Sequence, residues 1–378
     1  MTIQLFTPNF RVDECLLEIK ECLEKGWTGL GFKTNEIEER WKDYSGFEHA
    51  HFLSSATAGL HLALDIYKRE YHWNDGDEVI SSPFTFVSTN HAIKYCNLTP
   101  VFADIDEYLC LDPESVRSRI TEKTRAVIFV GIGGNVGRYE DIRKLCHEHN
   151  LILILDAAHM AGTRLNTKHI GLDADVSVFS FQAVKNLPTA DSGMICFKEQ
   201  KFDSQARILS WLGIDKDTFA RSSNQGAYKW RYDVKEVGYK YHGNSIMASL
   251  ALVGLKYLDQ DNGYRRTIAN WYTELLENVD GISIVKMAPN SECSQHLFQV
   301  RVNNRDMVLE KMNASDIFPG VHYADNTLYD PYRQSSKLCP QARIASDEVV
   351  SLPMHMGLVR DDVEYVAQVL IQAVSSEL

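Results

Sequence analysis

Short runs of apolar residues recur through the first half of the chain and alternate with stretches of helical spacing. This alternation limits the possible folds more than any other feature. Each run holds five to seven residues and is apolar on both faces that a strand would present. Such strands are typical of a mainly parallel sheet with helices on both sides. The runs are 78–83, 100–104, 124–130, 151–156, 176–181 and 193–197.

The rest of the chain extends this pattern. Residues 12–70 have helical spacing, interrupted by a short apolar piece at 51–53, and a long helix is expected over 244–261. The polar segment 199–237 is expected to be irregular. Residues 262–378 resemble a second α/β unit, so the sequence predicts a large α/β domain and a smaller C-terminal one. Strands of the smaller domain are expected near 282–285 and 297–302.

Charge and cysteine content narrow the class of protein. The 378 residues include 39 Lys and Arg against 51 Asp and Glu, a net charge of −12. This balance argues against general nucleic-acid binding, although a locally basic pocket can still take an anionic substrate. No run approaches the ~20 apolar residues of a membrane span, and the first residues do not resemble a signal peptide. The eight cysteines lie far apart with no CxxC pair, which predicts reduced thiols and a cytoplasmic protein.

A turn of small residues has the composition of an anion-binding site. The sequence Ser-Ser-Ala-Thr-Ala-Gly at 54–59 joins the apolar piece at 51–53 to a helical stretch beginning near Leu60. A strand, a small-residue turn and a helix in this order present backbone N–H groups to an anion. The turn therefore predicts a phosphate cradle.

Two reactive side chains follow the ends of predicted strands. Asp156 ends the run 151–156, at the place where ligands bind in open α/β sheets, and such a carboxylate can keep a pyridinium nitrogen protonated. Lys185 follows the run 176–181 among apolar neighbours, and desolvation of an amine favours Schiff-base chemistry. Each residue alone has an ordinary structural explanation. Together with the cradle and the aromatic Phe86, they supply every group that a pyridoxal phosphate site needs.

A glycine-rich turn at 131–137 suggests a different cofactor. It follows the run 124–130, and the acidic Asp156 ends the next run, which is close to a dinucleotide-binding fingerprint. The third glycine falls one place late for that fingerprint. A nicotinamide-dependent sugar oxidoreductase therefore stays an alternative.

The whole series resembles the nucleotide-sugar aminotransferases. These are fold-type I pyridoxal phosphate enzymes that make amino sugars for surface polysaccharides, such as the O-antigen of lipopolysaccharide, and for some antibiotics. The resemblance covers nearly the whole chain. The motifs that carry it are 26–31, 77–89, 100–106, 156–159, 180–186, 238–241, 322–323 and 351–355.

The resemblance implies a fold and a function. The expected fold is a large cofactor-binding domain at 1–255, with a mainly parallel sheet of the seven-stranded type flanked by helices, and a smaller α/β domain at 256–378. The N-terminal segment is expected to contact the small domain. The expected enzyme is a homodimer with shared active sites that converts a nucleoside-diphosphate-linked 3- or 4-keto-6-deoxy sugar to the amino sugar, with L-glutamate as donor. No metal, nucleic acid or membrane partner is expected.

The resemblance also implies a role for each site residue. Lys185 would form the Schiff base with pyridoxal 5′-phosphate and move the proton during catalysis. The remaining cofactor contacts would be Asp156 at the pyridine nitrogen, Phe86 on the ring, His159 near the 3′-hydroxyl, and Thr57, Ala58 and Ser180 at the phosphate. Where the family has an Asn that reaches the partner subunit's cofactor phosphate, Lys240, His242 and Asn244 compete for the role. Lys240, His242 and His322 are expected to contact the substrate.

Two further alternatives stay open. A sugar dehydratase of the same fold is associated with histidine in place of the lysine, whereas this chain has Lys185. A non-catalytic interaction protein of this fold is disfavoured because both Lys185 and Asp156 are present.

Overall fold

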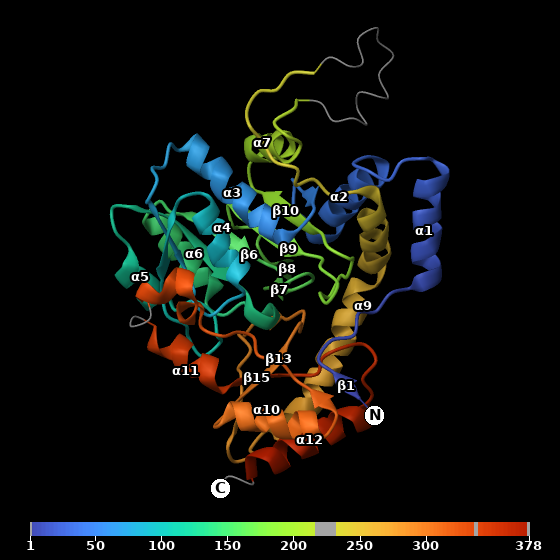
Figure 1. Cartoon of the computed structure of the whole chain (residues 1–378), viewed down its shortest axis with the longest axis vertical. Helices are drawn as coiled ribbons and strands as arrows, with labels where there is room; N and C mark the ends of the chain where they lie inside the picture. Colours follow the sequence, from blue (N-terminus) through green and yellow to red (C-terminus); the bar gives the residue numbers. More distant parts are fainter. Residues whose placement is uncertain (1, 216–231, 336–338, 376–378) are drawn as a thin grey trace.

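The structure is a computed structural model that describes residues 2–215, 232–335 and 339–375. Its centre is a seven-stranded sheet of order β2-β10-β9-β6-β5-β3-β4 (Figure 1). All neighbours in it are parallel except β10, which runs antiparallel to both β2 and β9. The predicted mainly parallel sheet is therefore confirmed. Its strands are β2 (His51–Leu53), β3 (Glu78–Ser81), β4 (Thr99–Phe102), β5 (Thr124–Val130), β6 (Ile152–Asp156), β9 (Val176–Ser180) and β10 (Gly193–Phe197).

Helices cover both faces of this sheet, because its central strands carry apolar side chains on both faces. Alternate residues of β5 enter two different cores: Val127 and Phe129 pack on one face, Ala126 and Ile128 on the other. A strand buried on both faces has no polar side, which explains the continuous apolar runs. The first core includes side chains of α2 (Phe32–Ser45), α6 (Tyr139–Glu148) and α9 (Ser245–Leu276). The second includes α3 (Ala56–Glu70), α4 (Val87–Tyr95), α7 (Gln200–Ser210) and α11 (Pro340–Glu348).

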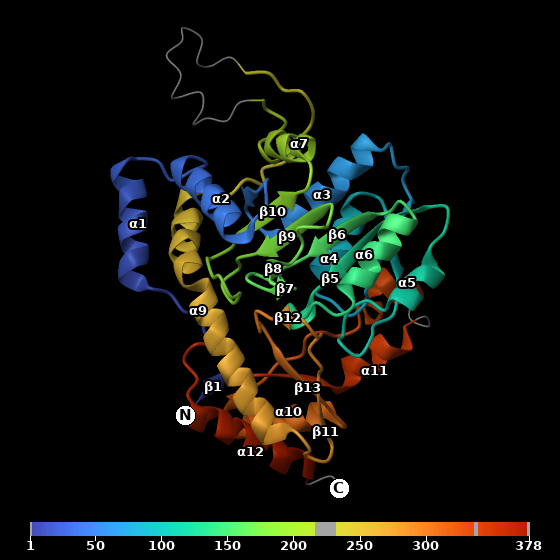
Figure 2. The ribbon, with the colours of Figure 1, turned by 180° about the vertical axis from the view of Figure 1, so that it is seen from behind.

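The C-terminal part has a sheet and a core of its own. Strands β11 (Ile282–Ile284), β13 (Phe298–Val302) and β15 (Val349–Leu352) form an antiparallel sheet in the order β11-β13-β15. In Figure 2 the long helix α9 runs from beside α1 and α2 down to this part of the molecule. The predicted boundary between 255 and 256 falls inside α9 and stays a prediction. Helices α10 (Arg305–Ala314) and α12 (Arg360–Ser375) complete the third core.

The N-terminal segment runs along the C-terminal part. Strand β1 (Ile3–Gln4) pairs in parallel with β14 (Ile317–Phe318), and the carbonyl of Leu5 accepts a hydrogen bond from Met354 N. Arg11 then makes a two-bond ion pair with Asp261 of α9, at 2.6 Å each. The chain continues into α1 (Val12–Glu24), the outermost helix in Figure 1. Further elements are α5 (Pro113–Arg119) and a small sheet of β12 (Ser291–Glu292), β7 (Arg164–Leu165) and β8 (Lys168–His169).

One prediction from the sequence is wrong, and one predicted helix is too short. Residues 200–210, expected to be irregular, form α7, because Phe202, Ala206 and Leu209 make a buried stripe at helical spacing. The helix expected over 244–261 continues to Leu276, because Ile268 and Tyr272 extend its apolar side into the third core. The segment 216–231 lies outside the described residues.

Two further observations concern the cysteines and the helices. All eight cysteines are free and buried. Among the helices in the described parts of the chain, none is both long enough and apolar enough to cross a bilayer.

Candidate active site

A cavity of about 440 Å³ opens at the carboxyl ends of β6 and β9, beside the start of α3. This is the sheet edge where ligands bind in open α/β folds. The predicted residues Thr57, Phe86, Asp156, His159, Ser180, Lys185 and His322 all line it. Its lining also includes Ser55, Thr85, Ser88, Gln182, Asp191 and Tyr323.

The start of α3 forms an open anion cradle. Ser55 caps the helix by accepting a hydrogen bond from Ala58 N at 3.1 Å, so the N–H of Ala58 is engaged. The N–H groups of Ala56 and Thr57 belong to the first turn of α3, so no carbonyl within the helix can accept their hydrogen bonds. They sit at the positive end of the helix dipole. A Cβ on Gly193 would lie 2.7 Å from Ala56 N, so the glycine keeps this end uncovered. The geometry suits a phosphate group.

Asp156 is a buried carboxylate with two hydrogen-bond donors. Its Oδ2 accepts from the hydroxyl of Thr89 at 2.8 Å and its Oδ1 from Ala158 N at 3.2 Å. Burial raises the pKa of Asp156, and the two donors and the charge of Lys185 oppose that rise. A carboxylate held in this way can keep a proton on a ring nitrogen brought against it.

Lys185 is a half-buried amine on the turn after β9. Burial lowers the pKa of Lys185 to about 8, against the opposing pull of the Asp156 charge. The next residue anchors the turn: Asn186 Nδ2 donates to Asn262 Oδ1 and to the carbonyl of Ser294, each at 2.7 Å. Asn186 Oδ1 accepts from His296 Nδ1 at 2.9 Å. The amine is therefore available as a nucleophile near neutral pH on a fixed backbone.

Four aromatic side chains border the same cavity. Phe86 is 58% exposed, so one face of its ring is open for stacking. Its ring centroid lies 6.0 Å from that of Tyr323, which in turn lies 5.9 Å from His159. Burial lowers the pKa of His322 to about 4, so its imidazole is neutral where it lines the cavity.

The predicted Ala58, whose N–H is engaged by Ser55, does not line this cavity, and three further predicted residues lie away from it. Asn244 caps α9 by accepting from Met247 N at 3.0 Å. Lys240 Nζ lies 3.5 Å from the centroid of the Trp211 ring, and His242 packs edge-on to the same ring. None of the three lines the cavity of its own chain.

Sequence reasoning missed several residues that the cavity brings together. Thr89 holds Asp156 from a helix 67 residues earlier, and nothing in the local sequence marks that contact. Gln182 and Asp191 belong to the same loop as Lys185, so their position in the chain was the available signal.

The glycine turn at 131–137 does not form a dinucleotide site. Residues 131–135 are buried, and a Cβ on Gly134 would lie 2.3 Å from Ser294 Oγ. The carbonyl of Gly133 accepts a hydrogen bond from His296 N at 2.9 Å. The segment around Ser294 and His296 thus covers the turn, which disfavours the nicotinamide alternative.

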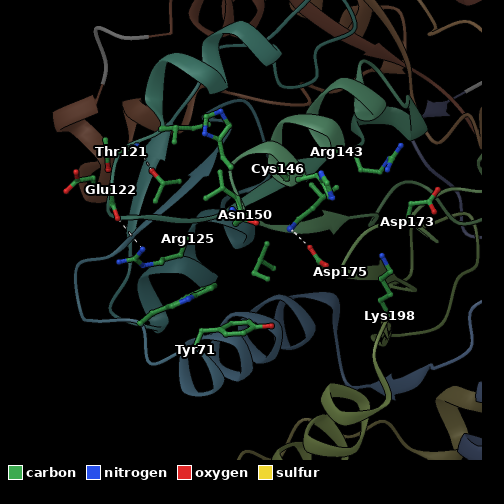
Figure 3. A pocket seen from close by; sticks show the side chains of 18 of the residues that line it. Tyr71, Thr121, Glu122, Arg125, Arg143, Cys146, Asn150, Asp173, Asp175 and Lys198 are labelled. Atoms are coloured by element: carbon green, nitrogen blue, oxygen red, sulfur yellow. Dashed lines mark hydrogen bonds between the residues drawn. The ribbon is translucent and has the colours of Figure 1, made fainter.

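A larger cavity, of about 1090 Å³, lies at the opposite ends of the strands (Figure 3). Three of its charged side chains already have partners. Arg125 pairs with Asp77 at 2.8 Å, Arg143 pairs with Glu140 at 2.8 Å, and Asp175 accepts from Leu153 N at 2.8 Å. The smaller cavity instead holds Lys185 and Asp156 at the sheet edge where ligands bind in open α/β folds, so we place the chemistry there.

Comparison with known proteins gives a consistent result. The model of the DegT/DnrJ/EryC1/StrS aminotransferase family matches residues 11–371. The spore coat polysaccharide biosynthesis protein SpsC of Bacillus subtilis is 31% identical over 367 residues, covering 94% of this chain and 93% of SpsC.

Two solved structures have the same fold over nearly their whole length. The aminotransferase TlmJ from Streptoalloteichus hindustanus superposes with a TM-score of 0.91 at 28% identity, covering 100% of both chains. The putative sugar aminotransferase Spr1654 from Streptococcus pneumoniae, in its PMP form, superposes with a TM-score of 0.91 at 27% identity, covering 99% of both.

Proposed function

The chain belongs to the DegT/DnrJ/EryC1/StrS aminotransferase family and is a sugar aminotransferase that uses pyridoxal 5′-phosphate, and on this premise we propose its substrates. The acceptor is a keto-sugar linked to a nucleoside diphosphate, a 3- or 4-keto-6-deoxy sugar, and the donor is L-glutamate. One observation carries the proposal: the Lys185 amine, the Asp156 carboxylate and the open start of α3 face one cavity.

The residues of the cavity fit the cofactor. Ala56 and Thr57 offer two backbone N–H groups to its phosphate, and Ser180 adds a hydroxyl. Asp156 would hold a proton at the ring nitrogen, and Phe86 would offer a face for the ring. When bound, pyridoxal phosphate supplies an electron sink for negative charge on the donor's α-carbon.

Lys185 has the properties that proton transfer in both directions requires. Its pKa, lowered by burial to about 8, lets it accept a proton from the donor's α-carbon and release one later near neutral pH. Asn186, tied to α9 and to Ser294, keeps the Lys185 backbone in place while the side chain moves. A histidine at this position would favour the dehydratase alternative, so Lys185 favours amination.

The proposed class of sugar and its pathway are supported by a relative of the chain and by the charges in the cavity. SpsC is a polysaccharide biosynthesis protein, and this supports a role of the present chain in surface polysaccharide assembly, as in O-antigen. The net charge of −12 does not oppose an anionic nucleotide, because the start of α3 and Lys185 place local positive charge in the cavity beside Asp156 and Asp191. His322, neutral and at the cavity wall, is proposed to contact the sugar.

We propose a homodimer with shared sites. Lys240 and His242 lie away from their own cavity, which supports a role at the partner subunit's cofactor or substrate. Asn244 is the weakest of the three candidates because its side chain already caps α9. The cytoplasm is the proposed compartment, since eight free cysteines suit a reducing environment.

The test separates the two half-reactions. Mixing the yellow enzyme with L-glutamate alone should bleach the visible band and release 2-oxoglutarate in a one-to-one ratio with active sites. Adding the correct nucleotide-linked keto-sugar should restore the band and give an amino sugar, identified by mass spectrometry across a panel of such sugars. Failure of every amino donor to bleach the band would overturn the aminotransferase assignment, and a sugar product that lacks nitrogen would favour the dehydratase.

A further inference from the structure

The glycine turn at 131–137 makes one contact that the proposed function does not use. The backbone N–H of Gly133 donates a hydrogen bond to His159 Nδ1 at 3.1 Å. Gly133 has a φ of +65°, a conformation that other residues rarely adopt. Close packing against Ser294 therefore holds the turn so that one N–H points at His159.

This contact determines which nitrogen of His159 carries the proton. A backbone N–H can only donate, so Nδ1 holds a lone pair. Burial lowers the pKa of His159 well below its usual value, and the nearby Lys185 and His322 act in the same direction. A neutral imidazole with a lone pair on Nδ1 has its proton on Nε2.

The tautomer in turn determines whether the Tyr323 hydroxyl donates or accepts the hydrogen bond with His159. His159 Nε2 lies 3.0 Å from the Tyr323 hydroxyl oxygen, so the histidine donates this bond and the tyrosine accepts it. The hydroxyl proton of Tyr323 has no acceptor in the described part of the chain, and Tyr323 lines the cavity. Both ring nitrogens of His159 are engaged, so Tyr323 holds the hydrogen-bond donor that faces a ligand.

Strand order indicates which edge of the cofactor meets this donor. The phosphate cradle lies beside β10, Asp156 ends β6, and Gly133 follows β5, on the far side of β6 from β10. The phosphate arm and the 3′-oxygen of pyridoxal phosphate leave opposite edges of its ring, on either side of the line from the ring nitrogen to the carbon that bonds the lysine. With the phosphate at α3, the 3′-oxygen faces the side of His159 and Tyr323.

We infer that Tyr323 donates a hydrogen bond to the 3′-oxygen of bound pyridoxal phosphate, and that His159 is a positioning residue held by the glycine turn. The inference rests on the proposed place of the cofactor in this cavity. It assigns the contact at the 3′-oxygen to Tyr323 in place of His159, and it gives the turn at 131–137 a function.

Three substitutions test the chain of contacts. Tyr323→Phe removes the donor. His159→Asn keeps an acceptor for the Gly133 N–H but loses the donor to Tyr323, whereas His159→Gln places an amide N–H close to the position of Nε2. The matched control is Tyr332→Phe, because Tyr332 also bonds a histidine, His91 at 2.6 Å, but does not line the cavity.

The main readout is the pH at which the visible band of the bound cofactor changes. A donor to the 3′-oxygen stabilises its anion, so losing the donor should raise this midpoint by roughly one pH unit. Tyr323→Phe and His159→Asn should both show this rise, and the double variant should show no more than either alone. His159→Gln and Tyr332→Phe should stay near the wild-type midpoint. An unmoved midpoint in Tyr323→Phe, or equal shifts in His159→Gln and His159→Asn, would overturn the inference.

A second readout needs no cofactor. In protein stripped of the cofactor and labelled with ¹⁵N-histidine, the nitrogen shifts of His159 should show a proton on Nε2. A proton on Nδ1 would overturn the inference even if a variant fails to fold. Borohydride reduction of the wild type separates this inference from the proposed site. If no adduct forms at Lys185, the proposed cofactor site is wrong. If the adduct forms but Tyr323→Phe does not shift the midpoint pH, only the role of Tyr323 is wrong.

Discussion

Replacing Thr89 by valine should slow the first half-reaction about tenfold or more without disrupting the fold. Thr89 is 1% exposed and donates its hydroxyl hydrogen to Asp156 Oδ2 at 2.8 Å. Valine has nearly the same shape but no hydroxyl, so the change removes one donor from a buried carboxylate. With one donor fewer, Asp156 would hold its own proton more tightly and would keep the ring nitrogen of the bound cofactor protonated less well, which would weaken the electron sink that the cofactor supplies.

The expected loss of rate follows from the contacts that Asp156 keeps in this variant. A hydrogen bond to a charged group contributes about 1.5–3 kcal/mol, and each 1.36 kcal/mol in a barrier is a factor of ten in rate. Ala158 N still donates to Asp156 at 3.2 Å, and Lys185 still opposes the rise in its pKa. We therefore expect the lower end of the range, a loss of about 10- to 30-fold in rate, with the pKa of Asp156 raised further.

Stopped-flow loss of the visible band, after mixing with saturating L-glutamate, measures this step directly. Thr124→Val is the matched control, because Thr124 is also a buried threonine with its hydroxyl beside a carboxylate, that of Glu78 at 3.4 Å, but lies at the start of β5. The control should keep the wild-type rate. If Thr89→Val binds the cofactor, folds and reacts within twofold of the wild type, the assignment of Thr89 as a support for Asp156 is refuted.

Three further predictions concern the reacting groups. Lys185→Ala should abolish turnover while circular dichroism stays unchanged, and borohydride should attach the cofactor to Lys185 of the wild type; an adduct on another lysine would contradict the assignment. Asp156→Asn should bind the cofactor but lower kcat by orders of magnitude, because a neutral amide cannot hold the ring nitrogen protonated, and a near-normal kcat would make Asp156 structural. Attachment of added cofactor to the stripped protein should speed up as pH rises toward about 8 and level off above, because only the neutral Lys185 amine attacks; a rate independent of pH between 6 and 9 would contradict the lowered pKa of Lys185.

The central sheet and the two reactive residues could be predicted because their signals are local. A strand buried on both faces must be apolar along its length, which makes such runs visible in the sequence. All six runs become strands, although β4 lies at the edge of the sheet and is only partly buried. Asp156 and Lys185 each stand at or just after a strand end, where the chemistry of a single residue type is informative. The helix α7 was missed because its apolar stripe has only three buried members within an otherwise polar segment.

The roles of the glycine turn, Thr89 and Tyr323 could not be predicted, because each depends on residues far apart in the chain. Gly133 reaches His159 across 26 positions, Thr89 reaches Asp156 across 67, and His159 reaches Tyr323 across 164. Glycines at 131–137 suit a dinucleotide turn and a buried packing turn equally well. Only the approach of Ser294 and His296 selects the second, because close packing of distant segments decides which backbone groups are covered and which side chain receives the free N–H.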